Sequence, residues 1–203
     1  MTKNLELLAT RTAQRGFSLV AVMIIMVIVS LLGVAASQLV LLGERSSRYD
    51  RDWQIAYQAA EAALVDAEVD IYGPNNTSTK SRTAGFASSS LLGFHDGCGK
   101  TVVDRGLCLP SLGSKPVWFN IDFFDKTANP PFAALGEFTD RIYPSGTAGV
   151  QSALPPRYII EAIPDQAPGY SARTPRLLHR VTAMGFGPNE DTQAVLQMVY
   201  RKE

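Results

Sequence analysis

The sequence has few cysteines and histidines, no excess of either charge, and one long stretch without a charged residue. Two cysteines in 203 residues are too few for a disulfide-rich mini-protein. The 19 basic residues balance 19 acidic ones, which argues against a nucleic-acid scaffold, because the basic face of such proteins usually shows in the net charge. Hydrophobic residues make up 46% of the chain, which excludes a largely disordered protein. What remains is one small soluble head attached to a very apolar segment.

The apolar segment runs from Phe17 to Leu42, and no Asp, Glu, Lys or Arg occurs between Gly16 and Gly43. As a helix, its 26 residues would extend over ~39 Å, which exceeds the ~30 Å hydrocarbon layer of a bilayer. Because the segment is apolar on every face, it favours a membrane crossing over a buried core helix.

The charges on either side of the segment predict its orientation. Lys3, Arg11 and Arg15 precede it against a single Glu6, whereas the charges of residues 44–52 cancel. Lys and Arg stay on the cytoplasmic side, so we expect the N-terminus inside and residues 44–203 outside. An ordinary signal peptide fits poorly, because the apolar run is longer than a typical h-region of ~7–15 residues and no clear cleavage site leads into a polar mature end. A plain signal anchor stays open.

The residues Gln14-Arg15-Gly16-Phe17-Ser18-Leu19 place a basic residue and a glycine directly before the apolar run. This arrangement resembles the prepilin leader of type IV pilins and type II secretion pseudopilins. The resemblance implies that a membrane peptidase cuts between Gly16 and Phe17 and methylates the new amino terminus. The apolar segment would then survive as the filament core, where five positions are expected to pack: Leu19, Ala21, Ile25, Val29 and Leu32.

The chain departs from this family pattern at the fifth mature position, where most pilins carry Glu and this sequence has Ala21. In the family, that Glu is thought to offset the buried terminal amine of the subunit assembled ahead of it. A charge left unpaired in an apolar core costs several kcal/mol. A subunit with no neighbour ahead has no such amine to neutralise, so Ala21 favours a subunit at or near the filament tip. Lineage drift at this position is the plainer alternative.

Residues 44–72 predict a second, amphipathic stretch of helix that stops at Gly73-Pro74. Its small and apolar residues recur every three or four positions and form one face. We expect this face to cover the head's own sheet, rather than to form a coiled coil. The run from Ala56 to Leu64 also resembles PilX-type minor pilins. The stripe comprises Tyr49, Trp53, Ala56, Ala60, Ala63, Ala67 and Ile71, widened by Tyr57 and Leu64.

The middle of the chain, residues 73–115, is rich in Gly, Ser, Thr and Asn and reads as a long surface excursion. Outside the cytoplasm, Cys98 and Cys108 are expected to form a disulfide that closes a short loop. By the chain-entropy estimate, such a bond stabilises the fold by roughly 2–3 kcal/mol. A metal site would need more ligands than these two thiols and His95 provide, so no metal is expected.

Further candidate ligands and bases have ordinary structural interpretations. Asn120, Asp122 and Asp125 could bind calcium, but the alternating run that contains them favours the wet face of a strand. Asp66 and Asp70 share a helix face, as carboxylates commonly do on a solvated helix.

Of the two histidines in the sequence, His95 lies near the cysteines and His179 lies in a predicted strand, where we expect it to be partly exposed. The sequence has no strong catalytic motif, so no enzymatic activity is expected.

Three C-terminal runs have strand character: 157–163, 178–186 and 193–201. Turn residues between the last two predict a hairpin, and the segment from Arg180 to Gly187 resembles the closing hairpin of PilX-like proteins. The expected fold is α+β and type IV pilin-like, with a long N-terminal helix packed on a C-terminal antiparallel sheet. The expected divisions are a leader (1–16), a transmembrane or filament-core helix (17–43), an amphipathic helix (44–72) and a periplasmic head (73–203).

The resemblance to PilX implies a minor type IV pilin that helps to initiate pilus assembly and to form the tip complex, and so supports twitching motility and adhesion. The implied partners are other minor pilins, the major pilin, a tip adhesin, the inner-membrane assembly platform and the prepilin peptidase. Neither a cofactor nor a nucleic acid is implied. The protein would cross the inner membrane once before assembly and reside in the pilus afterwards. Two alternatives remain open: a type II secretion minor pseudopilin, and a signal-anchored periplasmic enzyme or binding protein.

Overall fold

The computed structural model describes residues 17–74, 78–86, 90–111, 113, 115–165 and 176–202. The predicted leader, including Gly16, lies outside these residues. The chain divides into two compact units, Met1–Arg48 and Tyr49–Glu203, which are described separately below.

Helix α1 spans Phe17–Tyr72, so one helix begins in the first unit and ends in the second. It ends where the sequence predicted a stop: Gly73 has a φ of 79°, its amide donates to the carbonyl of Val69 at 2.8 Å, and Pro74 follows. Glycine adopts this left-handed conformation without a steric penalty, and proline cannot continue the helix.

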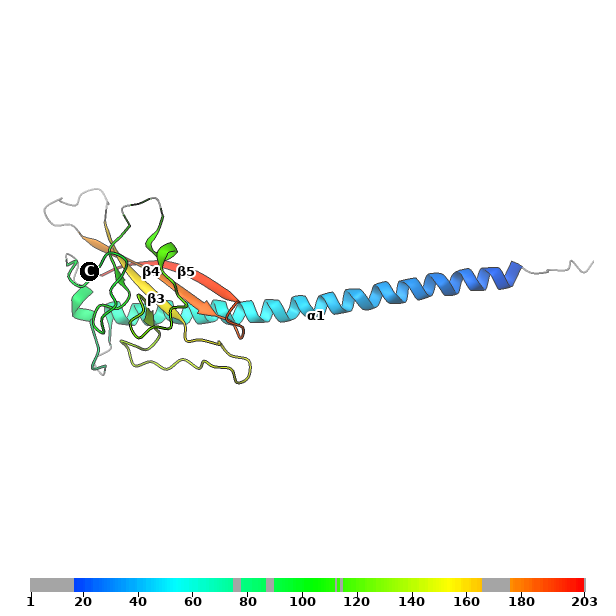
Figure 1. Ribbon diagram of the computed structural model, residues 1–203, viewed down its shortest axis with the longest axis horizontal. Coiled ribbons are helices and arrows are strands. Elements are labelled where there is room, and N and C mark those ends of the chain that lie inside the picture. The colour runs from blue at the N-terminus through cyan, green and yellow to red at the C-terminus, as the bar shows by residue number, and fades with distance from the viewer. Residues whose placement is uncertain are drawn as a thin grey trace, which may run out of the picture. The chain divides into compact units, whose positions relative to one another are not determined.

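The second unit contains a sheet of three long antiparallel strands, β3 (Arg157–Pro164), β4 (Leu177–Phe186) and β5 (Gln193–Arg201). Two short strands join β3: β1 (Leu107–Cys108) pairs with it in parallel and β2 (Ala133–Ala134) antiparallel. The sheet order is β1-β3-β4-β5, which leaves β5 at an edge. Figure 1 shows β3, β4 and β5 beside the second half of α1. The predicted α+β pilin-like fold and the β4–β5 hairpin are confirmed.

The alanine stripe of α1 covers one face of this sheet, as predicted. Ala56, Ala60, Ala63, Ala67 and Ile71 are all wholly buried. Small side chains let the helix and sheet backbones meet. A Cβ on Gly185 of β4 would lie 2.1 Å from the carbonyl oxygen of Ala56 and 2.3 Å from the amide nitrogen of Ala60. The first two positions of the predicted stripe do not belong to it, because Tyr49 and Trp53 are exposed.

The opposite face of the sheet carries a second apolar cluster, which differs from the sequence prediction. It joins Ile159, Met184 and Phe186 of the sheet to side chains from the middle segment and from the residues that follow it: Cys98, Cys108, Val117, Phe123 and Phe132. The middle segment is therefore only partly a surface excursion. Its apolar residues are far apart in the sequence, so no local periodicity revealed their burial.

The prediction of a strand around Asn120 is also wrong. Val117–Asn120 forms a short 3-10 helix, η2, and Asp122 and Asp125 each accept a hydrogen bond from a backbone amide two residues later, at 2.8 Å. Such local bonds let Asp compete with strand pairing. A second short 3-10 helix, η1, spans Thr83–Phe86.

Candidate assembly interface

The first unit presents an apolar helical surface. Nearly all its large side chains between Leu19 and Leu42 are at least half exposed, and the helix that contains them is long and apolar enough to cross a membrane. Of the predicted packing positions, Ala21 is half-buried and four are exposed: Leu19 (67%), Ile25 (60%), Val29 (60%) and Leu32 (63%). A continuous surface of this kind is unfavourable in water and suits lipid or other apolar helices.

Two hydroxyl groups of this segment are satisfied within the helix. Ser30 donates to the carbonyl of Met26 and Ser37 to that of Val34, each at 2.8 Å. Hydroxyls bonded in this way do not need water, so the segment can enter an apolar environment at little cost. Charges return only at its end, where Glu44 and Arg48 form an exposed ion pair.

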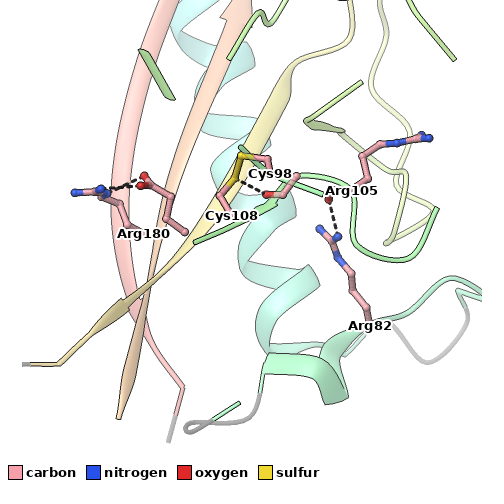
Figure 2. The surroundings of a disulfide bond; sticks show 7 residues. Arg82, Cys98, Arg105, Cys108 and Arg180 are labelled. Atoms are coloured by element: carbon pink, nitrogen blue, oxygen red, sulfur yellow. Dashed lines mark hydrogen bonds and ion pairs between the residues drawn. A yellow bond between two sulfur atoms is a disulfide. The ribbon is translucent and has the colours of Figure 1, made fainter. Parts of the chain in front are cut away.

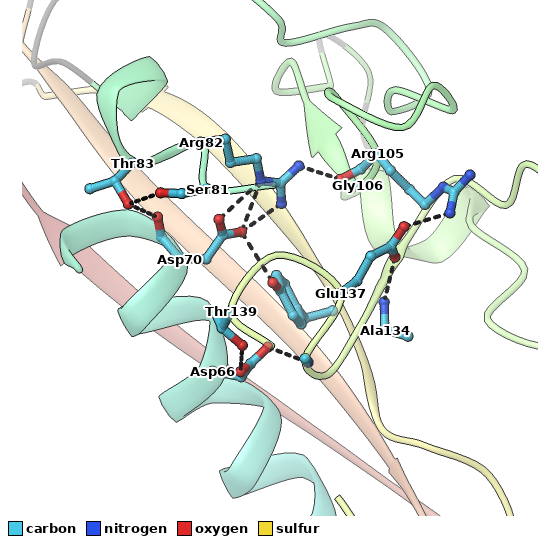
Figure 3. Close-up of polar contacts among 12 residues, drawn as sticks. Asp66, Asp70, Ser81, Arg82, Thr83, Arg105, Gly106, Ala134, Glu137 and Thr139 are labelled. Atoms are coloured by element: carbon cyan, nitrogen blue, oxygen red, sulfur yellow. Dashed lines mark hydrogen bonds and ion pairs between the residues drawn. The ribbon is translucent and has the colours of Figure 1, made fainter. Parts of the chain in front are cut away.

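The second unit buries a charged cluster beneath the loops of the head. Asp70, near the end of α1, is wholly buried and accepts hydrogen bonds from the Arg82 guanidinium at 2.6, 2.9 and 3.1 Å. The hydroxyl of Tyr158 in β3 donates to the same carboxylate at 3.1 Å. Figure 3 shows Arg82 pointing toward Asp70 on α1. Burial is the main cause that raises the pKa of Tyr158 well above its usual value, so this hydroxyl stays a donor.

Arg82 links this cluster to the rest of the head. It donates to the carbonyl of Arg105 at 2.7 Å, and its guanidinium lies 3.5 Å from the centroid of the Phe138 ring. Arg105 in turn pairs with Glu137 at 2.5 Å. A buried ion pair with several hydrogen bonds resists separation, so these contacts hold three loop segments in fixed positions.

One helical turn earlier, Asp66 is also wholly buried. It accepts a hydrogen bond from the hydroxyl of Thr139 and another from the amide of Gly136 at 2.9 Å. Desolvation raises the pKa of Asp66 despite these bonds. The prediction that Asp66 and Asp70 lie on a solvated face is wrong. No sequence pattern singled out their partners, Thr139 and Arg82.

Cys98 and Cys108 form a disulfide, with their Cα atoms 4.0 Å apart. Figure 2 shows the bond beside the sheet. Cys108 belongs to β1 and is wholly buried against β3, so the bond fixes the loop of residues 98–108 to the sheet. Cys98 and Gly106 both have positive φ, 69° and 74°, so the loop turns sharply near each end.

The two histidines occupy different surroundings. His95 is half exposed and its Nε2 lies 2.7 Å from the Asp104 carboxylate. His179 is wholly buried against the rings of Phe86 and Phe94, and neither ring nitrogen has a hydrogen-bond partner among the described residues. The prediction of a partly exposed His179 is therefore wrong. Burial lowers its pKa to about 4, so the imidazole is neutral near pH 7.

The polar side chains of the buried cluster bond to one another, and the described residues contain no group of three His, Cys, Asp or Glu side chains suited to a metal ion. What the chain offers to a partner is an uncharged apolar helix in one unit and a rigid head in the other.

Comparison with known families matches both parts of the chain. Residues 15–65 match the PilX N-terminal family, and residues 73–202 match the family described as type IV pilus assembly protein PilX C-term. No curated protein and no solved structure gives a significant match. Members of this family are structural components of the pilus. The chain accordingly belongs to the PilX family and is a minor pilin of the type IV pilus.

Proposed function

We propose that this minor pilin helps to initiate pilus assembly and forms part of the tip complex, where it joins other minor pilins, the major pilin and an adhesin. In this way it supports twitching motility and adhesion. Before assembly it crosses the inner membrane once, with its head in the periplasm. Residues 1–16 are a leader that prepilin peptidase removes, residues 17–43 become filament core, and residues 44–203 provide the amphipathic helix and the head.

The observation that carries this proposal is the exposed, uncharged helical surface of the first unit, which directly follows the Arg15-Gly16-Phe17 sequence. A surface of this kind is stable in lipid and equally stable against similar helices, so a subunit can pass from membrane to filament. Leu19, Ile25, Val29 and Leu32 supply the packing side chains.

Ala21 supports the proposed tip position. A shaft subunit buries its amino terminus beside the next helix and needs a carboxylate nearby, because an unpaired charge in an apolar core costs several kcal/mol. Ala21 provides no carboxylate for a subunit ahead, so this protein is suited to the first positions of the filament.

Leader removal is tested by the intact mass and N-terminal sequence of the full-length protein extracted from membranes and from pili. We expect a methylated Phe17 as the first residue, and an uncut precursor with loss of piliation in Gly16→Ala. A wild-type protein that begins at Met1, or a Gly16→Ala precursor that still supports normal piliation and twitching, would contradict the proposal.

The tip position is tested by immunogold labelling of pili. We expect gold at filament ends for the wild type. In Ala21→Glu, which regains the carboxylate, gold should also appear along the shaft. Wild-type label distributed along the whole filament would exclude a tip role while leaving leader processing and family membership intact.

A further inference from the structure

Strand β5 has an open edge. It pairs with β4 on one side, and no other described strand pairs with its second side. The carbonyl of Arg201 on this second side accepts a hydrogen bond from the hydroxyl of Tyr72. Because main-chain groups along a strand point the same way at every second residue, those of Val199, Gln197 and Val195 face the open edge as well.

This edge lacks the features that normally prevent strand pairing. Gln193–Tyr200 contains no charged residue and no proline. Val195, Met198 and Val199 are 38%, 47% and 52% exposed. Natural proteins usually protect a long exposed edge with Lys, Pro or a covering loop, because it otherwise pairs with other chains. An unprotected edge of this length indicates a strand that is completed by a partner.

A groove of about 430 Å³ runs beside this edge, between β5 and the second half of α1. Its floor is apolar, with Leu64 and Val65 from the helix and Leu196 and Met198 from the strand. Two carboxylates, Glu61 and Glu68, line the helix side, and both are exposed without an ion-pair partner among the described residues. The groove is therefore negatively charged along one wall.

We propose that an extended segment of a partner protein adds to β5 as a further strand, with basic side chains on the face toward Glu61 and Glu68 and apolar side chains on the other face. Basic and apolar residues would alternate along this segment, because successive side chains of a strand point to opposite faces. The basic side chains enter the acidic groove, while the apolar ones cover Val195 and Val199. The inference deepens the proposed function and rests on it, since the partner is another pilus component.

The charge of the groove distinguishes this partner from a second copy of the chain. If two copies paired through β5, each would bring its own Glu61 and Glu68 to the interface, and like charges repel. Main-chain hydrogen bonds would supply affinity, and the charged face would supply selectivity, as in other complexes that add a strand.

The test uses the full-length protein in detergent and a fluorescent ten-residue peptide of alternating valine and lysine, with binding read by anisotropy. We expect saturable binding that weakens as salt is raised, and at least tenfold weaker binding of a valine–glutamate peptide. Hydrogen exchange should also slow in the segment 193–201 when the valine–lysine peptide binds. Absence of binding, or binding without this protection, would overturn the inference.

Matched variants separate the contribution of the main-chain hydrogen bonds from that of the charged groove. Gln197→Pro removes a main-chain N–H that faces the open edge of β5. Gln197→Ala loses the same side chain but keeps this N–H. The proline should not disrupt the fold, because an edge strand tolerates proline where the N–H faces solvent. We expect Gln197→Pro to weaken binding at least tenfold relative to Gln197→Ala. Equal binding by the two variants would exclude strand addition.

Charge is tested by Glu61→Lys with Glu68→Lys, which should bind the valine–lysine peptide at least tenfold more weakly and prefer the valine–glutamate peptide. Asp96→Lys with Asp191→Lys makes the same charge change at exposed loop and turn sites outside the groove lining and should bind like the wild type. Equal binding by both double variants would contradict a role for the groove. A β5-dependent dimer of the wild type would assign the edge to a second copy instead. Because the assay does not involve pili, its failure leaves the proposed function open to its own tests.

Discussion

The two halves of helix α1 show how one continuous helix can be built for two different surroundings. In the first half the large apolar side chains are exposed, and the hydroxyls of Ser30 and Ser37 bond within the helix. In the second half alanines are buried against the sheet, and even the carboxylates Asp66 and Asp70 are buried. The first half therefore needs an apolar environment supplied from outside, whereas the second carries its partners in the same chain.

The largest expected effect comes from the buried charge in the second half. Asp70→Ala leaves the Arg82 guanidinium buried without its carboxylate, so we expect a loss of about 3–5 kcal/mol in the free energy of unfolding of the head. Glu68→Ala, on the exposed face of the same half, should change it by about 0.5 kcal/mol or less. Chemical denaturation of both variants measures the difference. Similar stabilities would show that burial does not distinguish the two carboxylates.

Glycine substitutions compare the packing of the two units directly. A Cβ at Gly185 meets the backbone of α1, so Gly185→Ala should destabilise the head by about 3 kcal/mol. At Gly33 in the first unit a Cβ meets nothing within 4 Å, so Gly33→Ala should leave the stability of the head unchanged. Thermal unfolding followed by near-ultraviolet circular dichroism tests both. A tolerated alanine at 185 would mean that the helix is not held tightly against β4.

Removing the disulfide should affect only the second unit. Replacing Cys98 and Cys108 by alanine should lower the free energy of unfolding of the head by roughly 2–3 kcal/mol, because the unfolded chain gains freedom. Hydrogen exchange of residues 18–43 should be unchanged. Free thiols in the exported wild-type protein, found by mass measurement under non-reducing conditions, would contradict the bond itself.

Lowering the pH is expected to have a smaller effect on the free energy of unfolding of the head. The folded pKa of His179 is about 4, below the ordinary 6.5, so the unfolded state takes up its proton first as the pH falls. Stability should therefore decline between pH 6.5 and 4, by about 2 kcal/mol from pH 7 to pH 5.

His179→Leu should remove this decline and leave stability at pH 7 nearly unchanged, because no hydrogen bond to the ring is lost among the described residues. The raised pKa of Asp66 acts in the opposite direction, since the folded state holds that proton more tightly. Asp66 is present in both the wild type and His179→Leu, so its contribution cancels when their pH profiles are compared. Parallel pH profiles of denaturant unfolding would exclude His179 as the source.

The sequence was sufficient wherever structure follows from local pattern. The three runs of strand character predicted β3, β4 and β5, and the alanine spacing of α1 predicted the face that this helix buries. The candidate site could be predicted less well from the sequence. Asp70 resembles any surface carboxylate until Arg82 lies against it, and Asp66 is buried by Thr139, which lies 73 residues away. Such burial depends on how loops return to the helix, and no spacing rule encodes that.

Three contacts join the end of α1 to the last residues of the chain. Tyr200 donates to the carbonyl of Leu64, Tyr72 donates to that of Arg201, and Lys202 reaches the carbonyl of Ile71 at 2.7 Å. Force applied to this part of α1 would pass in part through these contacts into β5. The ladder of main-chain hydrogen bonds then spreads it over β4 and β3. The sheet shares such a load with the loops that Asp66 and Asp70 hold against α1.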